Sequence, residues 1–465
     1  MEMTVQEQQL ASGSIRKTVW KYGIPCALIT LVNALYNIVD QIFIGQGVGY
    51  LGNSATNVIF PLTTIALALG LLVGSGCAAN YSIFLGSGKR EKASACMANS
   101  IVFIFIESIL FMVICLLLLP KMVIWFGATG ASYQYAIDYG SIIIYGFCFY
   151  MVSIGFSNML RADGRPKVAT VSTVIGCIIN CILDPLFIFV CHWGVKGAAW
   201  ATIIGQFASL VFSTVFIFRP QMVKFKAEDF KLSLRLFGKI ASAGITEFTL
   251  NVCIAVLFIV NNNLMRYYGA LSKFGADIPL ATYGIMMKLS HILTAIATGM
   301  GQGAQPLIGF CFGNGDYTRV KKTIRFSLLQ GLIIGVAVWL LYMIFARPIL
   351  LLFGAESELY MNFGVKLIRT YLGLVFLNSL VTTSSNIFMS LGKGYLGAIL
   401  QVSRNLILCA GVGAILCSFI GVEGVVYEGL IADGGAFVLA AVLMLITWKQ
   451  LGKMPRSQGT QSQAS

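Results

Sequence analysis

Amide and carboxyl side chains recur at helical spacing in an apolar stretch near the start of this sequence. Asn33, Asn37 and Asp40 occupy positions i, i+4 and i+7, so they share one helix face, with Tyr36 beside them. A lone amide in such a helix more often joins two helices than binds a ligand. A carboxylate there is costly to bury, so Asp40 favours a functional site.

Two further polar pairs lie in later apolar stretches of the first half. Asn180 and Asp184 are four residues apart, with Pro185 following them, and Thr202 and Gln206 are also four apart. Each pair therefore lies on one helix face. Together with the first stripe, these pairs predict a polar cavity with two carboxylates. Such a cavity would attract a proton, Na⁺ or an organic cation.

Polar residues in the second half are more scattered, and several interpretations stay open. Lys288 could neutralise a carboxylate or serve a function, whereas His291 favours packing over proton relay. Arg404 and Lys366 are expected to extend to a membrane interface. The remaining candidates are Glu247, Asn251, Asn261, Asn262, Asn263, Gln302, Gln305 and Asp433, with Glu107 in the first half lacking an obvious partner.

Helices that cross a membrane must position these residues. Of the 465 residues, 57% are hydrophobic and 11% charged, against about 25% charged in a typical soluble protein. An apolar stretch of about 20 residues crosses the hydrocarbon as a helix, which satisfies its own backbone polar groups. No cleavable signal peptide is expected, because the first stretch is too long and lacks a cleavage site. Twelve spans are predicted: 22–44, 58–85, 96–119, 137–160, 168–191, 197–218, 240–264, 281–311, 324–346, 365–389, 397–420 and 425–448.

The basic residues indicate how these spans are oriented. When the loops are numbered alternately from the inside, 23 of the 32 Lys and Arg residues fall inside and five outside. This bias predicts cytoplasmic termini and a multi-pass protein of the cell membrane. The net charge of +14 therefore reports topology and contact with anionic lipid, and no nucleic-acid partner is expected.

An internal repeat divides the chain into halves. Residues 1–218 are predicted as a six-helix N-terminal lobe, 219–239 as a cytoplasmic linker, and 240–465 as a six-helix C-terminal lobe with a short tail. Because six spans return the chain to its starting side, the two lobes are parallel and pseudo-symmetric, as in many secondary transporters. The recurring residues include Gly74, Gly76, Gly86 and Gly88, which return 227 residues later as Gly301, Gly303, Gly313 and Gly315, and Asp40, which corresponds to Asn261 at an offset of 221.

Motifs of enzymes and ATP-driven pumps do not fit. Gly88-Lys89 resembles the end of a phosphate-binding loop, but Ile83 and Arg90 occupy positions that need Gly and Ser or Thr. The two histidines are too far apart for a zinc protease motif, and no CxxC pair occurs among the twelve cysteines. We therefore expect no enzyme activity, no cofactor, no metal beyond a possible Na⁺, and no need for an ATPase subunit.

Four stretches resemble the multidrug and toxic compound extrusion (MATE) family, closest to its MepA-like bacterial branch. They are IPCALITLVNALYNIVDQIFIG (24–45), LGSGKREKA (85–93), NMLRADGRPKVAT (158–170) and NCILDPLFIF (180–189). The resemblance covers nearly all twelve spans. It implies an all-α integral membrane protein with twelve transmembrane helices in a V-shaped pair of lobes. It also implies antiport of organic cations against H⁺ or Na⁺ by a protein that is expected to be a monomer.

The resemblance also implies roles for particular residues. Asp40, Asn180, Asp184 and Thr202 match the coupling-ion site of the N-terminal lobe, and Pro25 matches the proline where the first span bends. In the second lobe, Glu247 could bind Na⁺, but Asn261 stands where the repeat places the counterpart of Asp40. The predicted substrate cavity contains Asn33, Tyr36, Asn37, Asn158, Gln206 and Glu247.

Three alternatives remain from the sequence. A flippase for lipid-linked oligosaccharides belongs to the same superfamily, but it would favour a cavity rich in Arg and Lys to hold pyrophosphate. An intramembrane enzyme would need a catalytic constellation that is not found. A membrane receptor would not need two carboxylates in a repeated lobe.

Overall fold

The computed structural model describes residues 10–48, 50–126, 130–275, 277–352 and 358–453, and these residues form helices without any strand. The helices before the linker are α2 (Ile15–Gly47), α3 (Tyr50–Gly86), α4 (Arg90–Trp125), α5 (Gly130–Ala162), α6 (Pro166–Pro185) with the π-helical segment η1 (Leu186–Val190), and α7 (Gly194–Ile217). Those after it are α8 (Leu234–Ala270), α9 (Asp277–Gly313), α10 (Tyr317–Leu352), α11 (Glu358–Tyr371), α12 (Val375–Ser390), α13 (Gly394–Val402), the π-helical segment η3 (Ser403–Gly411), α14 (Val412–Ile420) and α15 (Glu423–Lys453).

Each of the twelve predicted spans falls within one helix or one group of consecutive helices, or extends beyond it by one residue. The tenth is bent by 45° between α11 and α12, and the eleventh runs through α13, η3 and α14. Within the described part of the chain, nine helices are long and apolar enough to cross a membrane, or ten if the bent pair is one span. The prediction of an all-α integral membrane protein is confirmed.

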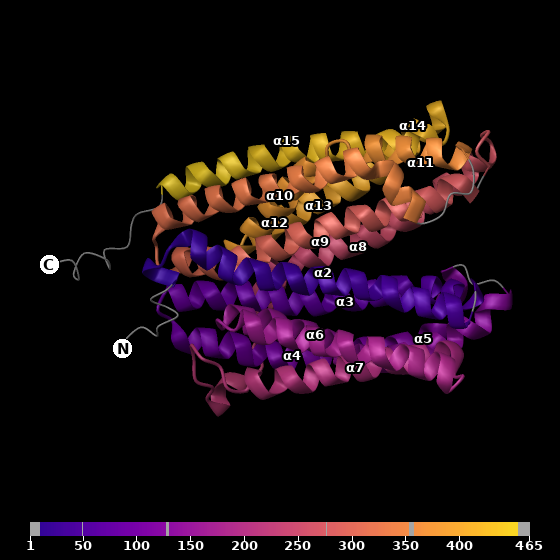
Figure 1. Cartoon of the computed structure of the whole chain (residues 1–465). Helices are drawn as coiled ribbons and strands as arrows, with labels where there is room; N and C mark the ends of the chain where they lie inside the picture. Colours follow the sequence, from indigo (N-terminus) through magenta and orange to yellow (C-terminus); the bar gives the residue numbers. More distant parts are fainter. Residues whose placement is uncertain (1–9, 49, 127–129, 276, 353–357, 454–465) are drawn as a thin grey trace.

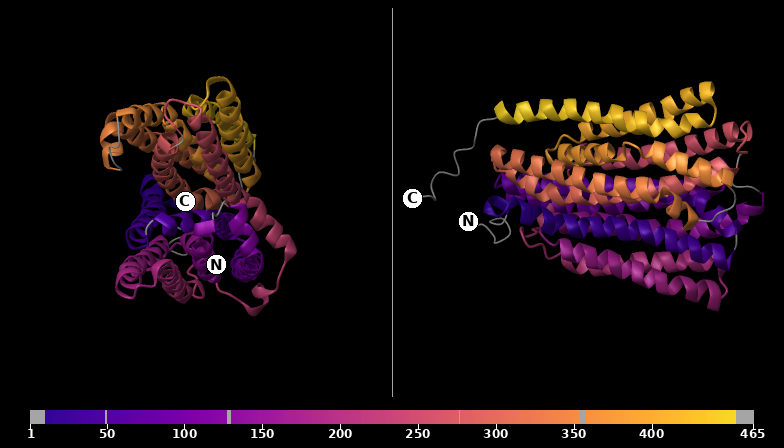
Figure 2. Two further views of the ribbon diagram at one scale, coloured as in Figure 1. Left: turned by 90° about the vertical axis from the view of Figure 1, so that its right-hand side faces the viewer. Right: turned by 45° about the horizontal axis from the view of Figure 1, so that its top comes forward.

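The helices form two bundles that diverge into a V (Figure 1). Helices α2–α7 make one bundle and α8–α15 the other, and an end-on view separates the two clearly (Figure 2). Between the bundles, α2 packs on α9, and α3 packs on α8 and α9. The two bundles therefore meet through the first two helices of each half.

The repeated glycines explain how the halves approach so closely. A Cβ on Gly86 of α3 would lie 1.8 Å from the carbonyl oxygen of Phe310 on α9, and one on Gly313 would lie 2.0 Å from that of Ile83. Each glycine thus removes a side chain where one half touches the other. The glycines that repeat in the sequence therefore lie at equivalent positions in the contact between the two lobes.

The linker between the two halves is hydrogen-bonded to α4 of the first half. Asn99 on α4 donates to the Asp229 carbonyl at 2.7 Å and accepts from the Ser233 N–H at 2.9 Å, and the Ser94 hydroxyl donates to Asp229 Oδ2 at 2.6 Å. A short 3-10 helix, Ala227–Phe230, lies in this segment. The segment ends earlier than predicted, because residues 234–239 already belong to α8.

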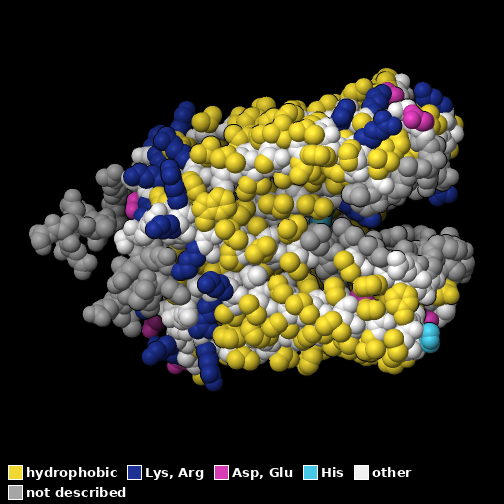
Figure 3. Space-filling view, in the orientation of Figure 1, with side chains coloured by type: hydrophobic (Ala, Val, Ile, Leu, Met, Phe, Trp, Pro, Cys, Tyr) yellow, Lys and Arg dark blue, Asp and Glu magenta, His cyan; other side chains and the backbone are white. Residues whose placement is uncertain are grey.

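Lys and Arg side chains gather at the end of the molecule where α2 begins and α15 ends, with a smaller group over the second half at the opposite end (Figure 3). Between these ends, the visible surface of the helices is largely hydrophobic. This pattern agrees with a membrane-embedded belt, and which end faces the cytoplasm stays a prediction.

The orientation predicts which cysteine substitutions react from outside the cell. In a background without reactive native cysteines, Lys224→Cys in the linker should resist an impermeant thiol reagent in intact cells. Lys196→Cys, an exposed position predicted to be outside, should be labelled readily and is the matched control. Rapid labelling at position 224 in unbroken cells would reverse the orientation. A corresponding probe at Ser457 lies outside the described residues.

Candidate functional site

Four predicted residues come together in the first half. Asp40 on α2 and Asp184 on α6 are buried, and their carboxyl groups lie within hydrogen-bonding reach of each other. Asn180 donates through Nδ2 to Asp184 Oδ1 at 3.2 Å and to Thr202 Oγ1 on α7 at 3.3 Å. We call Asp40, Asn180, Asp184 and Thr202 the carboxyl cluster.

The carboxyl cluster offers oxygen atoms that the described residues leave unpaired. Asp40 Oδ1, Asp184 Oδ2 and Asn180 Oδ1 are all buried and have no hydrogen-bond partner in that part of the structure. Buried acceptors without donors are costly and call for a ligand that supplies positive charge or a proton. A proton or Na⁺ fits this all-oxygen set.

The local backbone changes at the same place. Asp184 is followed by Pro185, which ends α6, and the chain continues as the π-helical segment η1. Proline removes one backbone donor, and π-helical turns recur at functional sites. On the first helix, α2 runs as one helix from Ile15 through Pro25 to Gly47. The Thr170 hydroxyl donates to the Pro25 carbonyl at 3.3 Å, and a functional bend at Pro25 stays a prediction.

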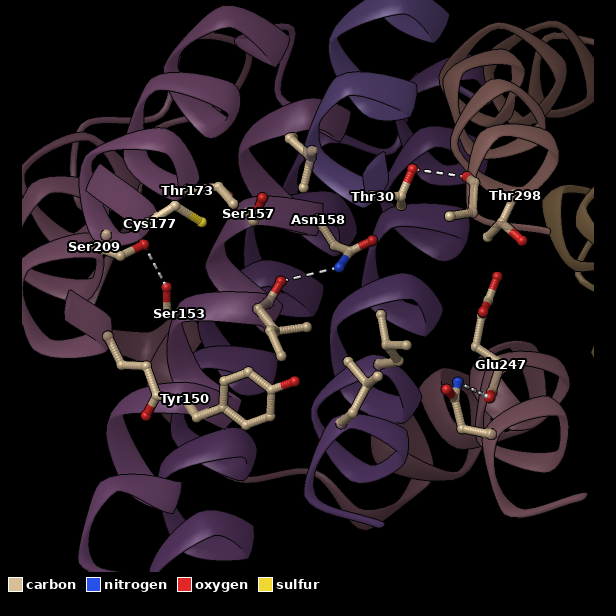
Figure 4. Close-up of a pocket in the computed structure, with 18 of the residues that line it drawn as sticks. Thr30, Tyr150, Ser153, Ser157, Asn158, Thr173, Cys177, Ser209, Glu247 and Thr298 are labelled. Atoms are coloured by element: carbon tan, nitrogen blue, oxygen red, sulfur yellow. Dashed lines mark hydrogen bonds between the residues drawn. The ribbon is translucent and has the colours of Figure 1, made fainter. Parts of the chain in front are cut away.

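A cavity of about 210 Å³ lies between the two halves, and Asn180 and Thr202 are part of its wall. Hydroxyl groups from the first half face it on one side, and Glu247 of α8 lies on the other (Figure 4). The Ser153 and Ser209 hydroxyls are 2.8 Å apart. The carboxyl cluster thus lies next to this central cavity, with Asn180 and Thr202 belonging to both.

Three of the residues predicted for the substrate cavity line the central cavity. Asn158 donates to the Ile154 carbonyl at 2.9 Å, Gln206 belongs to the wall, and the buried Glu247 accepts from Gln302 Nε2 at 3.1 Å. Asn33, Tyr36 and Asn37 lie on α2, but their side chains are outside the described part of the structure.

Arg161 follows the predicted fourth span, 137–160, by one residue, but it still belongs to α5 and its side chain is buried. It lies in the last turn of α5, is 6% exposed, lines the central cavity and donates to Asn158 Oδ1. It also interacts electrostatically with Glu247 across the two halves. The three-residue spacing from Asn158 puts both on one helix face, which was the available signal.

One buried carboxyl group of the second half is not among the residues predicted from the sequence. Glu428 of α15 is fully buried and accepts from Asn261 Nδ2 and from the thiol of Cys409, the latter at 3.6 Å. Asn261 also donates to the Tyr283 hydroxyl at 2.8 Å. Asn261 is the repeat counterpart of Asp40, so the second half keeps a polar centre but takes its carboxylate from its last helix.

Arg404 does not extend to an interface as expected. It is 8% exposed and pairs with Asp433 through Nε at 2.9 Å and through its terminal nitrogen at 2.8 Å. Asp433 on α15 explains this position, because a buried guanidinium paired with a carboxylate costs less free energy than an unpaired one in lipid. Lys366 is partly exposed and pairs with Glu423 at 2.7 Å, and its place at a membrane interface stays a prediction.

Comparison with known proteins agrees with this architecture. The curated relatives include the multidrug export protein MepA of Staphylococcus haemolyticus (strain JCSC1435), which is 26% identical over 438 residues and is covered over 93% of each chain. The protein of the same name from Staphylococcus aureus (strain MSSA476) is 23% identical over 430 residues, covering 92% of this chain and 93% of its own.

Solved structures with the same fold include a multidrug resistance MATE family transporter of the MOP superfamily in its outward-facing conformation. Its TM-score is 0.89 at 22% identity, over 97% of this chain and all of that one. A MOP superfamily transporter from Pyrococcus furiosus, described as having a binding pocket of reverse polarity, has a TM-score of 0.90 at 22% identity, over 98% and 100% of the two chains. These likenesses establish the fold.

The family is settled by a match that spans both halves. The family model MatE matches residues 25–186 and 269–415. The two segments cover more than half of the chain and include most helices of each bundle. The chain therefore belongs to the MatE family.

Proposed function

We propose that this protein is a secondary active multidrug efflux transporter, which exports lipophilic organic cations by antiport with H⁺ or Na⁺. The observation that carries the proposal is that Asn180 and Thr202 belong both to the carboxyl cluster and to the wall of the central cavity. The names of the MepA relatives support the export of drugs. We place the transporter in the cell membrane as a monomer with both termini cytoplasmic.

The proposed mechanism is competition for negative charge. Asp40 and Asp184 bind the coupling ion, because two adjacent carboxylates with little water favour an added cation. Once that ion is bound, the cluster attracts a cationic substrate less strongly, and the substrate leaves. A change in the angle between the lobes then exposes the cavity to the other side.

The ion gradient supplies the free energy. The electrical part contributes about 2.3 kcal/mol for each charge moved through 100 mV. Hydroxyl, amide and apolar groups line the central cavity together, and such a wall can accept ligands of several shapes.

Transport of a fluorescent cation in proteoliposomes tests the proposal. An imposed H⁺ or Na⁺ gradient should drive ethidium against its concentration gradient, and collapse of that gradient by an ionophore should stop it. Separate H⁺ and Na⁺ arms identify the coupling ion. Absence of uphill movement in both arms, with monodisperse protein correctly inserted, would refute the proposal.

A lipid-linked oligosaccharide flippase is the second candidate. Arg161 in the central cavity is the observation in its favour, because a guanidinium can hold pyrophosphate. Glu247 lies on the same cavity and interacts with this guanidinium, so the site is not a cluster of cations. A fluorescent lipid pyrophosphate that crosses proteoliposomes without any ion gradient would favour this candidate.

We predict that the lobes contribute unequally to coupling. Glu247→Gln removes a charge from the cavity wall but keeps a group that can bond to Gln302. It should therefore lower ion-driven export severalfold rather than abolish it, and less than loss of Asp40 or Asp184. Export rates at matched reconstitution check this. A loss with Glu247→Gln equal to that of the aspartate variants would place essential coupling in the second lobe.

A further inference from the structure

A second, separate pocket of about 380 Å³ lies where α6 begins and α7 ends. It is at the end of the molecule that carries the dense band of Lys and Arg (Figures 1 and 3). Its wall is formed by Gly164, Arg165, Val168, Val215, Phe216, Arg219 and Gln221. None of these residues lines the central cavity.

Arg165 is fixed in one orientation in this pocket, which we call the arginine pocket. Its two terminal nitrogens donate to the carbonyls of Phe216 at 3.1 Å and Arg219 at 2.6 Å, and its guanidinium lies 5.9 Å from the centre of the Phe216 ring. Its Nε is buried without a hydrogen-bond partner among the described residues. A guanidinium held this way is ready for an anion without further ordering.

The positive charge of the arginine pocket is only partly offset. Asp163 lies 3.8 Å from Arg165 Nε, but its oxygens already accept from the N–H groups of Gln221 and Met222 and from the Tyr81 hydroxyl. The exposed Arg219 side chain forms no ion pair within the described part of the chain. The pocket therefore keeps an excess of positive charge that suits a phosphate.

Apolar side chains continue from the arginine pocket along the outer face of the two helices. Val168 and Val215 form its wall, and Val215 is 58% exposed. Val171 on α6 and Val211 on α7 are exposed further along the helices. An anion bound at the arginines would thus lie at the end of a lipid-facing apolar track.

We propose that the arginine pocket binds the phosphate of an anionic phospholipid, whose acyl chain lies along α6 and α7. Basic pockets between helices at the cytoplasmic side are suited to anionic head groups, and that leaflet holds such lipids. The apolar track favours a lipid over free phosphate. The repeat counterpart of Arg165 is Lys393, which instead donates to Gln450 at 2.5 Å, so the site belongs to one lobe.

Lipid binding to the purified full-length protein tests this inference. Native mass spectrometry should show phosphatidylglycerol retained in preference to phosphatidylcholine with the same acyl chains. Arg219→Gln should weaken the tightest phosphatidylglycerol site roughly fivefold, as expected for one surface charge. The control Lys231→Gln removes another exposed charge, in the linker and outside the pocket, and should leave that affinity unchanged.

A second measurement locates the lipid. Phosphatidylglycerol with a photoreactive acyl chain should crosslink to peptides that contain Val168 or Val215 in the wild type, and much less in Arg219→Gln. Equal affinity for the two lipids, unchanged binding in Arg219→Gln, or crosslinks only elsewhere would overturn the proposal. Glycerophosphoglycerol, the head group alone, should bind far more weakly, and equal binding would overturn the assignment to a lipid.

Discussion

Asp40→Asn and Asp184→Asn should each abolish ion-driven export while leaving the protein folded. Asparagine keeps the size and much of the hydrogen bonding of each buried side chain, but it removes the charge that holds a cation. The two carboxyl groups lie within hydrogen-bonding reach. We therefore expect one carboxyl group alone to bind the coupling ion too weakly for export. We expect the rate of dye export in proteoliposomes to fall at least a hundredfold in each variant.

The matched control is Glu107→Gln. Glu107 is also a carboxyl group inside a membrane helix, on α4, and its Oε2 is buried without a partner among the described residues. It is not part of the central cavity wall, so export should remain near the wild-type rate. Near-normal export in both aspartate variants would mean that the carboxyl cluster stabilises the fold and does not bind the coupling ion.

The double variant separates a shared site from two independent ones. If Asp40 and Asp184 bind one cation together, removing both should be little worse than removing either, because contacting groups are not additive. Their titration, followed by the pH dependence of dye binding, should also behave as that of a pair. Losses that multiply in the double variant would argue for two separate sites.

Much of the fold could be predicted because membrane helices have a strong sequence signal. Long apolar stretches and the bias of basic residues follow from the properties of lipid alone. The repeated glycines were visible in the sequence, but their partners were not. That Gly86 meets Phe310, and Gly313 meets Ile83, depends on how the two halves face each other.

The carboxyl cluster could be predicted in part for a similar reason. The proximity of Asn180 and Asp184 could be predicted from their spacing of four residues, because that spacing places both on one helix face. Their meeting with Asp40 and Thr202 was implied by the family resemblance rather than by spacing. Glu428 gave no such signal, because its partner Asn261 lies 167 residues away on another helix. Contacts of that kind depend on tertiary packing.

Arg404→Met should destabilise the protein by about 3–5 kcal/mol, because it leaves the buried Asp433 carboxylate without its partner. Arg404 also donates to Asn405 Oδ1 at 2.7 Å, so a second acceptor loses its donor. Equilibrium unfolding in mixed micelles measures the loss. Lys366→Met is the control, because the Lys366–Glu423 pair is 42% and 39% exposed and such pairs contribute only about 0–1 kcal/mol.

The double variant Arg404→Met/Asp433→Leu decides what this ion pair does. Replacing a buried pair by apolar side chains of similar size is often neutral or stabilising, since both desolvation costs disappear. The double variant should therefore regain most of the stability lost in Arg404→Met. If it regains stability but exports dye slowly, the pair serves transport rather than folding. A loss of stability in the double variant at least as large as the sum of the two single losses would contradict the account, because it would mean that each side chain stabilises the lobe on its own.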